Sequence, residues 1–477
     1  MSRSLAILFA GFTLVPATPA PPPGPIDSRT DPDRASIDRY LQAEMTSRHI
    51  PGLQIVISRA HHVILSASYG LADVASGRPV DSSTSFEIAS ITKQFTDAAV
   101  LLLAQEGKLA LDDRVARYLP GLPPAWQSIT IRQLMTHTAG LRDDWDEDDA
   151  FFQTRVTDSS FLAALESAPL RFPPGTGFSY GCGPFVLGML VSRVTGTPYH
   201  QFMRDRVFRP LGLASTGINE FDARTDSAVG YRLQGDSLIP GVRISAAAHA
   251  RGDVGIHATA LDLARWDAVL DGNSLLSTMN RRTMFSPARL TSGYVVPYGL
   301  GWFIRPWRGH REVEHDGGFR TGFSSTIGRY PEDSLTIIVL TNRQSAHAYS
   351  IVRGLLSLYD SEFTPISRMT PAHGDWPAED AAIRRSFDAV ANGRAAPDFA
   401  PGTMLLTGTP PAELKQGLAG YAAPELIDCR PVHHRRGWPP ADAGIEVCFV
   451  RAASPAGTYW SFTFDRHHRI TYVEPEE

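Results

Sequence analysis

Strand-like segments stand near both ends of this chain, and a mostly helical stretch lies between them. Residues 53–58 and 63–69 alternate β-branched and polar residues around a short turn, which predicts a hairpin. Similar runs return after Tyr298 and end in a predicted helix; the runs occupy 299–304, 312–315, 322–329 and 335–341, and the helix 346–359. Short connections between the late strands predict antiparallel pairing. We therefore expect an α/β (α+β) fold whose sheet joins both ends of one unit around a helical insertion at about 90–280.

The segments outside this unit differ in composition. Residues 1–20 have the pattern of a secretory signal peptide, in which Arg3 precedes an apolar stretch and small residues. A Pro-rich tether (21–34) leads into the sheet unit (35–362), which begins with a predicted helix at 35–48, and a Pro- and Gly-rich linker (363–377) follows the unit. Helices near 379–393 and 411–421 and three strands predict a small α+β domain at 378–477. We expect a periplasmic or secreted protein without a transmembrane segment.

Charge and cysteine content narrow the function classes. A net charge of −5 provides no basic surface, so nucleic acid is not an expected partner. The chain has three cysteines, and Cys429 and Cys448 lie in strand-like runs that could be neighbours. An oxidising compartment would favour a disulfide between them, and two buried thiols are the alternative.

Lysine is rare in this chain, which makes one lysine informative. Only three of the 45 basic Lys and Arg residues are lysines, and Lys93 follows Ser90 by three positions. Arginine stays protonated, whereas a desolvated lysine can lose its proton and act as a base beside a hydroxyl. Ser-x-x-Lys on a helix places both side chains on one face.

The residues after Ser90 predict that helix. Apolar residues recur at helical spacing from Ile91 to Ala104, and Gly107 is a predicted C-cap. A hydroxyl and an amine at the start of a helix lie near its positive end, which favours an alkoxide and disfavours an ammonium. The alternative is a structural serine that caps the helix, followed by a solvated lysine.

Further motifs extend the pattern along the sheet unit. Residues of about 35–360 resemble the serine β-lactamase and penicillin-recognising hydrolase family, in its class C, carboxypeptidase and esterase branch. The matching segments, in chain order, are Ser90–Lys93, 109–113, 130–141, 174–180, 251–256, 298–302 and 315–319. The last 100 residues fall outside this resemblance and are only weakly similar to cystatin-like or nuclear-transport-factor-2-like modules.

The resemblance implies a site that needs no cofactor or metal. Ser90 would be the nucleophile that forms an acyl-enzyme, and Lys93 and Tyr180 would share the base role, Tyr180 as a tyrosinate of lowered pKa. The backbone N–H groups of Ser90 and Gly318 would form the oxyanion hole. His315 and Gly317 would meet the substrate; a cation at His315 would orient a carboxylate, but a histidine is mostly neutral at pH 7 and grips it less firmly than a lysine.

One position departs from the family pattern. Where β-lactamases and D-Ala peptidases of the family have Tyr-x-Asn, this chain has Tyr180-Gly181-Cys182, and a thiol is a poor replacement for an amide that holds a substrate carbonyl. The sequence thus predicts a serine hydrolase for a small-molecule or peptide substrate, with an ester or a D-amino-acid peptide or amide as the bond cleaved. A β-lactamase and a degenerate member that binds ligands without turnover remain alternatives, and the oligomeric state stays open.

Three other features have simpler interpretations. The acidic run at 143–149 is typical of a solvated loop, although it could repel anionic substrates or bind a cation. The histidines at 433 and 434 are adjacent and lack the spacing of a ligand pair. His137 has no acidic partner nearby in sequence, and we interpret it as structural.

Overall fold

The computed structural model describes residues 31–142, 157–167, 169–218, 226–242, 252–308, 310–360, 363–369, 374–392, 394, 398–405, 422–432, 444–453 and 458–476. The predicted signal peptide, most of the tether, the acidic run at 143–149, the predicted helix at 411–421 and the two histidines at 433–434 lie outside these residues.

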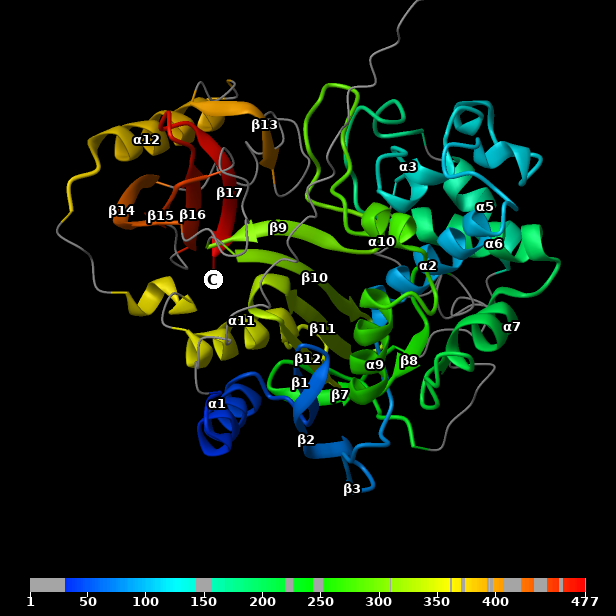
Figure 1. The fold of residues 1–477 in the computed structure, drawn as a ribbon. Helices are drawn as coiled ribbons and strands as arrows, with labels where there is room; N and C mark the ends of the chain where they lie inside the picture. The colour runs from blue at the N-terminus through cyan, green and yellow to red at the C-terminus, as the bar shows by residue number, and fades with distance from the viewer. Residues whose placement is uncertain are drawn as a thin grey trace, which may run out of the picture.

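An antiparallel sheet organises the first 360 residues (Figure 1). Its seven strands follow the order β3-β2-β1-β12-β11-β10-β9. Their bounds are β1 Gly52–Arg59, β2 His62–Asp73, β3 Arg78–Pro79, β9 Phe303–Trp307, β10 His310–Phe319, β11 Phe323–Tyr330 and β12 Leu335–Thr341. Strand β1 pairs with β12, with Leu53 opposite Thr341, so the predicted union of both ends in one sheet is confirmed.

The predicted strand at 299–304 is displaced, because β9 begins only at Phe303. Gly301 precedes it with a φ of 74°, in the left-handed region that favours glycine. A Cβ atom at Gly301 would lie 2.6 Å from the Cα of Gln94, so the chain passes here directly against the helix that follows Ser90. Gly301 is part of this close approach and not of the strand, although the alternating pattern alone predicts it as strand.

Each face of the sheet is covered by its own helices. Helices α1 (Arg34–Ser47) and α11 (Ala348–Tyr359) pack on one face through a buried cluster that includes Leu41, Ile55 and Leu355. The other face carries the helical part of the chain. Its helices are α2 Thr92–Gln105, α3 Ile131–Met135, α5 Asp158–Ser167, α6 Gly183–Thr195, α7 Tyr199–Met203, α9 Ala260–Asp271 and α10 Thr278–Met284.

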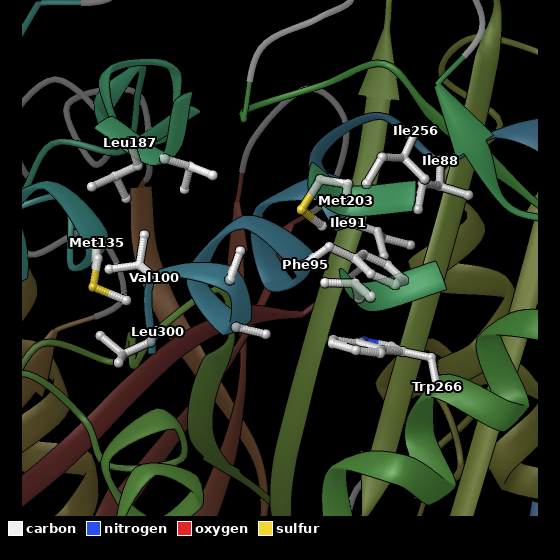
Figure 2. Close-up of a cluster of buried hydrophobic side chains, with 14 of the residues drawn as sticks. Ile88, Ile91, Phe95, Val100, Met135, Leu187, Met203, Ile256, Trp266 and Leu300 are labelled. Carbon is white, nitrogen blue, oxygen red and sulfur yellow. The ribbon is translucent and has the colours of Figure 1, made fainter. Parts of the chain in front are cut away.

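Helix α2 is the centre of this second layer. Its residues from Thr92 to Leu103 are buried on every side, as expected of a helix inside a core. Figure 2 shows Phe95 against Trp266 of α9, and the two rings stack with centroids 4.1 Å apart. Gly107, with a φ of 71°, follows the end of the helix where the sequence predicts its cap. Tight packing on all sides holds the start of α2, and with it Ser90, in one position.

Two small sheets complete the helical layer. Strands β4 (Phe86–Glu87), β8 (Ile256–Ala258) and β5 (Gly217–Ile218) form one, and β6 (Tyr231–Gln234) pairs with β7 (Ser237–Pro240). Strand β4 ends three residues before Ser90, so the small β4-β8-β5 sheet supports the segment that leads into the site.

The C-terminal part forms a separate sheet with helix α12 (Pro377–Ala391) on one face. We expected three strands, but the structure describes five, in the order β13-β17-β16-β15-β14. Their bounds are β13 Phe399–Leu405, β14 Ala422–Pro431, β15 Glu446–Ala453, β16 Thr458–Phe464 and β17 Ile470–Glu476. Proline and glycine inside β13 and β17 obscure the strand pattern in the sequence.

Cys429 of β14 lies directly opposite Cys448 of β15, and the two form a disulfide. Of the two alternatives that the sequence left open, the structure therefore has the disulfide, and Cys182 is the free cysteine. Among the described residues, no helix is both long and apolar enough to cross a membrane.

The disulfide predicts a simple count of reactive thiols. Protein that is made in an oxidising compartment and denatured without reductant should take up one iodoacetamide, at Cys182. After reduction it should take up three, at all cysteines of the chain. Intact-mass spectrometry measures both numbers, and alkylation at Cys429 without reductant would contradict the pairing.

Candidate active site

Ser90 lies in the short 3-10 helix η1 (Ala89–Ile91), which runs directly into α2. The preceding residue, Ala89, has a φ of 44°, in the left-handed region that costs an alanine conformational energy. Ser90 itself is half-buried, whereas Ala89 and Ile91 are fully buried. The surrounding core therefore holds a strained turn, and this turn presents one hydroxyl at the edge of the helical layer.

Lys93 reaches that hydroxyl from the next turn of the helix, as the spacing predicts. Its Nζ lies 2.9 Å from Ser90 Oγ and donates a second hydrogen bond, 3.1 Å long, to the carbonyl oxygen of Asp253. The lysine is only 4% exposed. A buried amine held against a serine hydroxyl is placed to exchange a proton with it.

Tyr180 lies beside this pair. The Nζ of Lys93 is 5.0 Å from the centre of the Tyr180 ring, and the Tyr180 hydroxyl is within hydrogen-bonding reach of Ser90 and Lys93. Burial of the hydroxyl raises the pKa of Tyr180 even though Lys93 lowers it. The expected tyrosinate is therefore wrong for the free protein: desolvation outweighs the neighbouring cation, and Tyr180 is a neutral phenol.

His315 lies on β10, fully buried on the same side of the sheet. Its Nδ1 is 2.6 Å from the carbonyl oxygen of Asp316, so Nδ1 carries the proton. Nε2 then accepts a 3.1 Å hydrogen bond from the Tyr298 hydroxyl, and the Tyr180 hydroxyl is 3.5 Å away. Burial, together with Lys93, lowers the pKa of His315 to about 3. His315 is therefore a neutral acceptor that orients tyrosines, which agrees with the weak grip on a carboxylate expected from the sequence.

The strand that carries His315 has an open edge beside Ser90. Strand β9 pairs with β10 only as far as Glu314, so within the described residues no strand covers that edge at 315–319. Gly317 packs on the turn before the nucleophile, because a Cβ atom there would lie 2.2 Å from the carbonyl oxygen of Ile88. Gly318 is exposed, and a Cβ atom there would meet nothing within 4 Å.

A hydrogen bond fixes this contact. Ser325 Oγ, on the neighbouring strand β11, donates to the same Ile88 carbonyl at 2.9 Å. The open N–H edge next to Ser90 is where the predicted oxyanion donors, Ser90 and Gly318, would act. The missing side chain at Gly317 thus lets the strand lie close to the nucleophile. The space beside Gly318 leaves room for a substrate.

Cys182 and His137 are both buried below the surface that a substrate would contact. Cys182, at the start of α6, is 3% exposed, and its thiol donates to the Arg142 carbonyl at 3.3 Å. It therefore takes a structural contact in place of the substrate contact that we expected. His137 is also buried and accepts a hydrogen bond from the Gly181 N–H at Nδ1, while its ring packs on Tyr180 with centroids 4.5 Å apart. Its structural interpretation agrees with these contacts.

Sequence reasoning missed three groups around the site. Tyr298, which holds His315, was part of a matched motif but was not identified as a site residue. Asp97 lies one turn beyond Lys93, fully buried, and neither of its carboxyl oxygens has a hydrogen-bond partner among the described residues. Burial raises the pKa of Asp97 well above its usual range although Lys93 opposes this, so the carboxyl is neutral. The i+4 spacing from Lys93 was the signal that could have found it.

The third group is Glu87 on β4. It is buried and accepts a 3.1 Å hydrogen bond from Thr321, and burial nevertheless raises the pKa of Glu87 to about 7. In the described part of the chain, no three His, Cys, Asp or Glu side chains are grouped so as to hold a metal ion. The assembled groups are a nucleophile, an amine, a phenol and an open N–H edge, which together suit acyl transfer.

Comparison with known proteins agrees with this geometry. The model of the Beta-lactamase family matches residues 37–357, which include every residue of the site. The chain belongs to this family. Penicillin-binding protein 4* of Bacillus subtilis is 29% identical over 317 residues, which are 62% of this chain and 69% of that protein. Protein flp of Staphylococcus aureus strain MW2 is 27% identical over 367 residues, 71% of this chain and 72% of that protein.

Solved structures of Beta-lactamase relatives have the same fold. A penicillin-binding protein from Bacillus halodurans is 26% identical, with a TM-score of 0.59, over 67% of this chain and 99% of that chain. The octameric penicillin-binding protein homologue from Pyrococcus abyssi is 21% identical, with a TM-score of 0.61, over 93% of this chain and 90% of that chain. That second likeness concerns the fold, and it extends beyond the family match into the C-terminal sheet.

The two adjacent glycines of β10 should respond differently to the same added methyl group. Gly317→Ala should push β10 away from the Ile88 carbonyl and lower the rate of Ser90 acylation by about a hundredfold, because a displacement of about 1 Å has an effect of that size. Gly318→Ala should stay within about threefold of wild type, since its Cβ meets open space. The labelling rate with a fluorophosphonate probe measures both, and equal rates for the two variants would contradict the assigned contact.

Burial of Glu87 predicts a pH-dependent stability. Its pKa is about 7 in the folded protein and near 4.5 in the unfolded chain, so the folded state binds the extra proton between these values. Wild-type stability should therefore be lost as pH rises from about 4.5 to about 7. Glu87→Gln keeps an acceptor for Thr321 and has no such cost. Its melting temperature, measured by circular dichroism, should exceed that of wild type at pH 8 by more than at pH 4.5. A difference that does not change with pH would show that Glu87 does not titrate in this range.

Proposed function

We propose that this protein is an exported serine hydrolase that forms an acyl-enzyme at Ser90 and cleaves carboxylesters or D-amino-acid peptides and amides. The observation that carries the proposal is the 2.9 Å contact between the Lys93 amine and the Ser90 hydroxyl inside a buried pocket of neutral groups. Export rests on the signal-like residues 1–20.

The mechanism uses the Lys93 amine in its unprotonated form and Tyr180 as a neutral phenol. Ser90 Oγ attacks the substrate carbonyl and passes its proton to the Lys93 amine, and the oxyanion is held by the N–H groups of Ser90 and Gly318. The neutral Tyr180 phenol protonates the leaving oxygen or nitrogen as the tetrahedral intermediate collapses, and Lys93 returns a proton to Tyr180. Water then attacks the acyl-enzyme by the same route in reverse and releases the acid and Ser90.

Two supporting contacts keep these groups in place. The Asp253 carbonyl anchors the Lys93 amine, and the neutral His315 ring accepts from Tyr298 beside Tyr180. Because His315 is uncharged, it does not add a second positive charge beside the Lys93 amine. The arrangement supports acyl transfer at one serine.

The substrate preference rests on what the pocket lacks. The Cys182 thiol is bonded to a backbone carbonyl, so it offers no amide to a β-lactam or a peptide, and the neutral His315 offers no cation to a substrate carboxylate. An ester needs neither contact. The relatives named penicillin-binding proteins make acylation of Ser90 by a penicillin a reasonable second reaction, with slow release of the product.

Substitution of the nucleophile and the base tests the chemistry. Ser90→Ala should abolish labelling by a fluorophosphonate probe while the circular dichroism spectrum stays unchanged, because only one oxygen is lost. Lys93→Arg keeps the charge but cannot lose the proton, so labelling and ester hydrolysis should fall by at least about a hundredfold. If Lys93→Arg retains most of the wild-type rate, the amine is not the base. A wild-type protein that fails to label would indicate a ligand-binding member without turnover.

A substrate panel tests the preference. We expect kcat/KM for p-nitrophenyl butyrate to exceed that for nitrocefin by at least about tenfold, the value of one lost hydrogen bond of about 1.4 kcal/mol. A D-alanyl-D-alanine peptide should fall between them or replace the ester as the best substrate. Nitrocefin turnover that matches the best ester would assign the protein to β-lactam hydrolysis.

A further inference from the structure

A buried group of charges lies behind the catalytic strand and joins the two parts of the chain. On β10, Glu312 and Glu314 alternate with His315, so their side chains are on the opposite face of the sheet from the nucleophile. Arg305 of β9 stands directly opposite Glu312 in the strand register. It contacts Glu312 at 3.1 Å and Glu314 at 2.6 Å, and all three side chains are at most 8% exposed.

Helix α11 adds a second guanidinium to the same group. Arg353 contacts Glu312 at 2.8 Å, and its guanidinium lies 4.3 Å from the centres of the Trp307 and Tyr349 rings. The hydroxyls of Tyr349 and Tyr330 also donate to Glu312, at 2.8 and 3.0 Å. Each oxygen of Glu312 therefore has more than one donor.

The remaining partner of Arg353 comes from the last strand of the C-terminal sheet. Glu474 of β17 is 2% exposed and contacts Arg353 at 2.5 Å and Arg305 at 3.8 Å. Tyr472 donates to its other oxygen at 3.1 Å. Figure 1 shows β17, in red, beside the green β9 at this edge of the large sheet. Residues more than 100 positions apart thus share one buried charge group.

Two guanidiniums and three carboxyl groups make up this group, and Glu474 is the second carboxyl partner of Arg353. The two guanidiniums lower the pKa of Glu312 to about 2 although burial opposes them, so Glu312 is ionised. Burial, together with the neighbouring carboxylates, raises the pKa of Glu314 well above its usual range, although Arg305 opposes this. Two cations then face the carboxylates of Glu312 and Glu474. Removal of Glu474 would take one of two carboxyl partners from the buried Arg353, and loss of a partner from a buried ion pair is strongly destabilising.

We propose that Glu474 is a positioning residue for the active site and that the C-terminal sheet is an integral part of the catalytic unit. By neutralising Arg353 and approaching Arg305, Glu474 keeps β9 and β10 in register behind His315. This role replaces the interpretation of residues 378–477 as an appended domain. This proposal depends on the proposed function only in the experiments that measure the reactivity of Ser90.

A further contact supports the same interface. Arg308, just after β9, lies 5.2 Å from the centre of the Phe449 ring on β15 and donates to the Thr364 carbonyl at 2.6 Å. Phe449 is fully buried on the face of the C-terminal sheet opposite α12, in a cluster with Ile366 of the segment that follows the large sheet unit. The C-terminal sheet therefore has a second point of contact with the segment that follows β9, besides the charge group.

The test is a double-mutant cycle on the full chain. Glu474→Gln should lower the melting temperature by at least about 5 °C and slow fluorophosphonate labelling of Ser90 at least about fivefold, at a temperature where the protein is folded. Arg353→Met should do the same. The double variant Glu474→Gln with Arg353→Met should lie closer to wild type than either single variant in both measurements, because Arg305 and Glu312 still balance.

A matched control uses an exposed pair of the same sheet. Glu425 and Arg451 contact each other with side chains about half exposed, so Glu425→Gln and Arg451→Met should leave both measurements within error of wild type. A sheet that merely adds contact area would instead make the double variant at least as unstable and as slow as the worse single variant, and this result would overturn the proposal.

Three further results of this experiment would also decide the proposal. If Glu474→Gln is not recovered as soluble protein, recovery of the double variant with near wild-type labelling supports the proposal, and its loss overturns it. If wild-type protein does not label at all, the proposed function fails, while the melting temperatures of the cycle still decide the charge balance. Melting temperatures that follow the cycle with unchanged labelling rates would reduce Glu474 to a structural residue and overturn the positioning role.

Discussion

The packing of β10 on the turn before Ser90 is the contact on which the rest of the site depends. The missing side chain at Gly317 lets the strand lie against the Ile88 carbonyl, which Ser325 also binds. On one side of this contact stand Ser90 and Lys93, held by a helix that is buried all round, and on the other stands the open edge at Gly318. The nucleophile and the Gly318 oxyanion donor come from segments more than 200 residues apart in the chain, so their distance can be set only by such a rigid packing contact.

Burial, more than pairing, determines the electrostatics around Lys93. Tyr180, His315 and Asp97 are each of a type that titrates, yet desolvation pushes the pKa of each in the direction that leaves it neutral. For an acid this direction is upward and for an imidazole it is downward, so one physical cause produces all three results. The amine then works among uncharged dipoles, which suits proton transfer between Lys93, Ser90 and Tyr180 because no fixed anion traps the proton on the lysine.

Local spacing made much of this readable in the sequence, and the rest depended on three-dimensional burial. The Ser90–Lys93 contact, the union of β1 with β12 and the Cys429–Cys448 disulfide follow from residue types at short range or from alternation, and the structure confirms them. The charge state of Tyr180 was misjudged because it depends on how much water the surrounding fold removes. Five C-terminal strands were taken for three, since proline and glycine inside a strand hide its alternation.

The two faces of β10 explain why the last strand of the chain matters to the site. The face with His315 consists of neutral polar groups, and the face with Glu312 and Glu314 consists of ion pairs, so the same strand separates two different electrostatic environments. A strand between such layers is sensitive to an unbalanced charge on either side, because a buried ion without a partner is relieved most easily by backbone movement or by water entry. In this chain the balancing carboxylate is not on a neighbouring element of the large sheet but on β17, near the C-terminus. A domain boundary at the Pro- and Gly-rich linker therefore separates the two sheets. Residues on both sides of that boundary nevertheless share one group of buried charges.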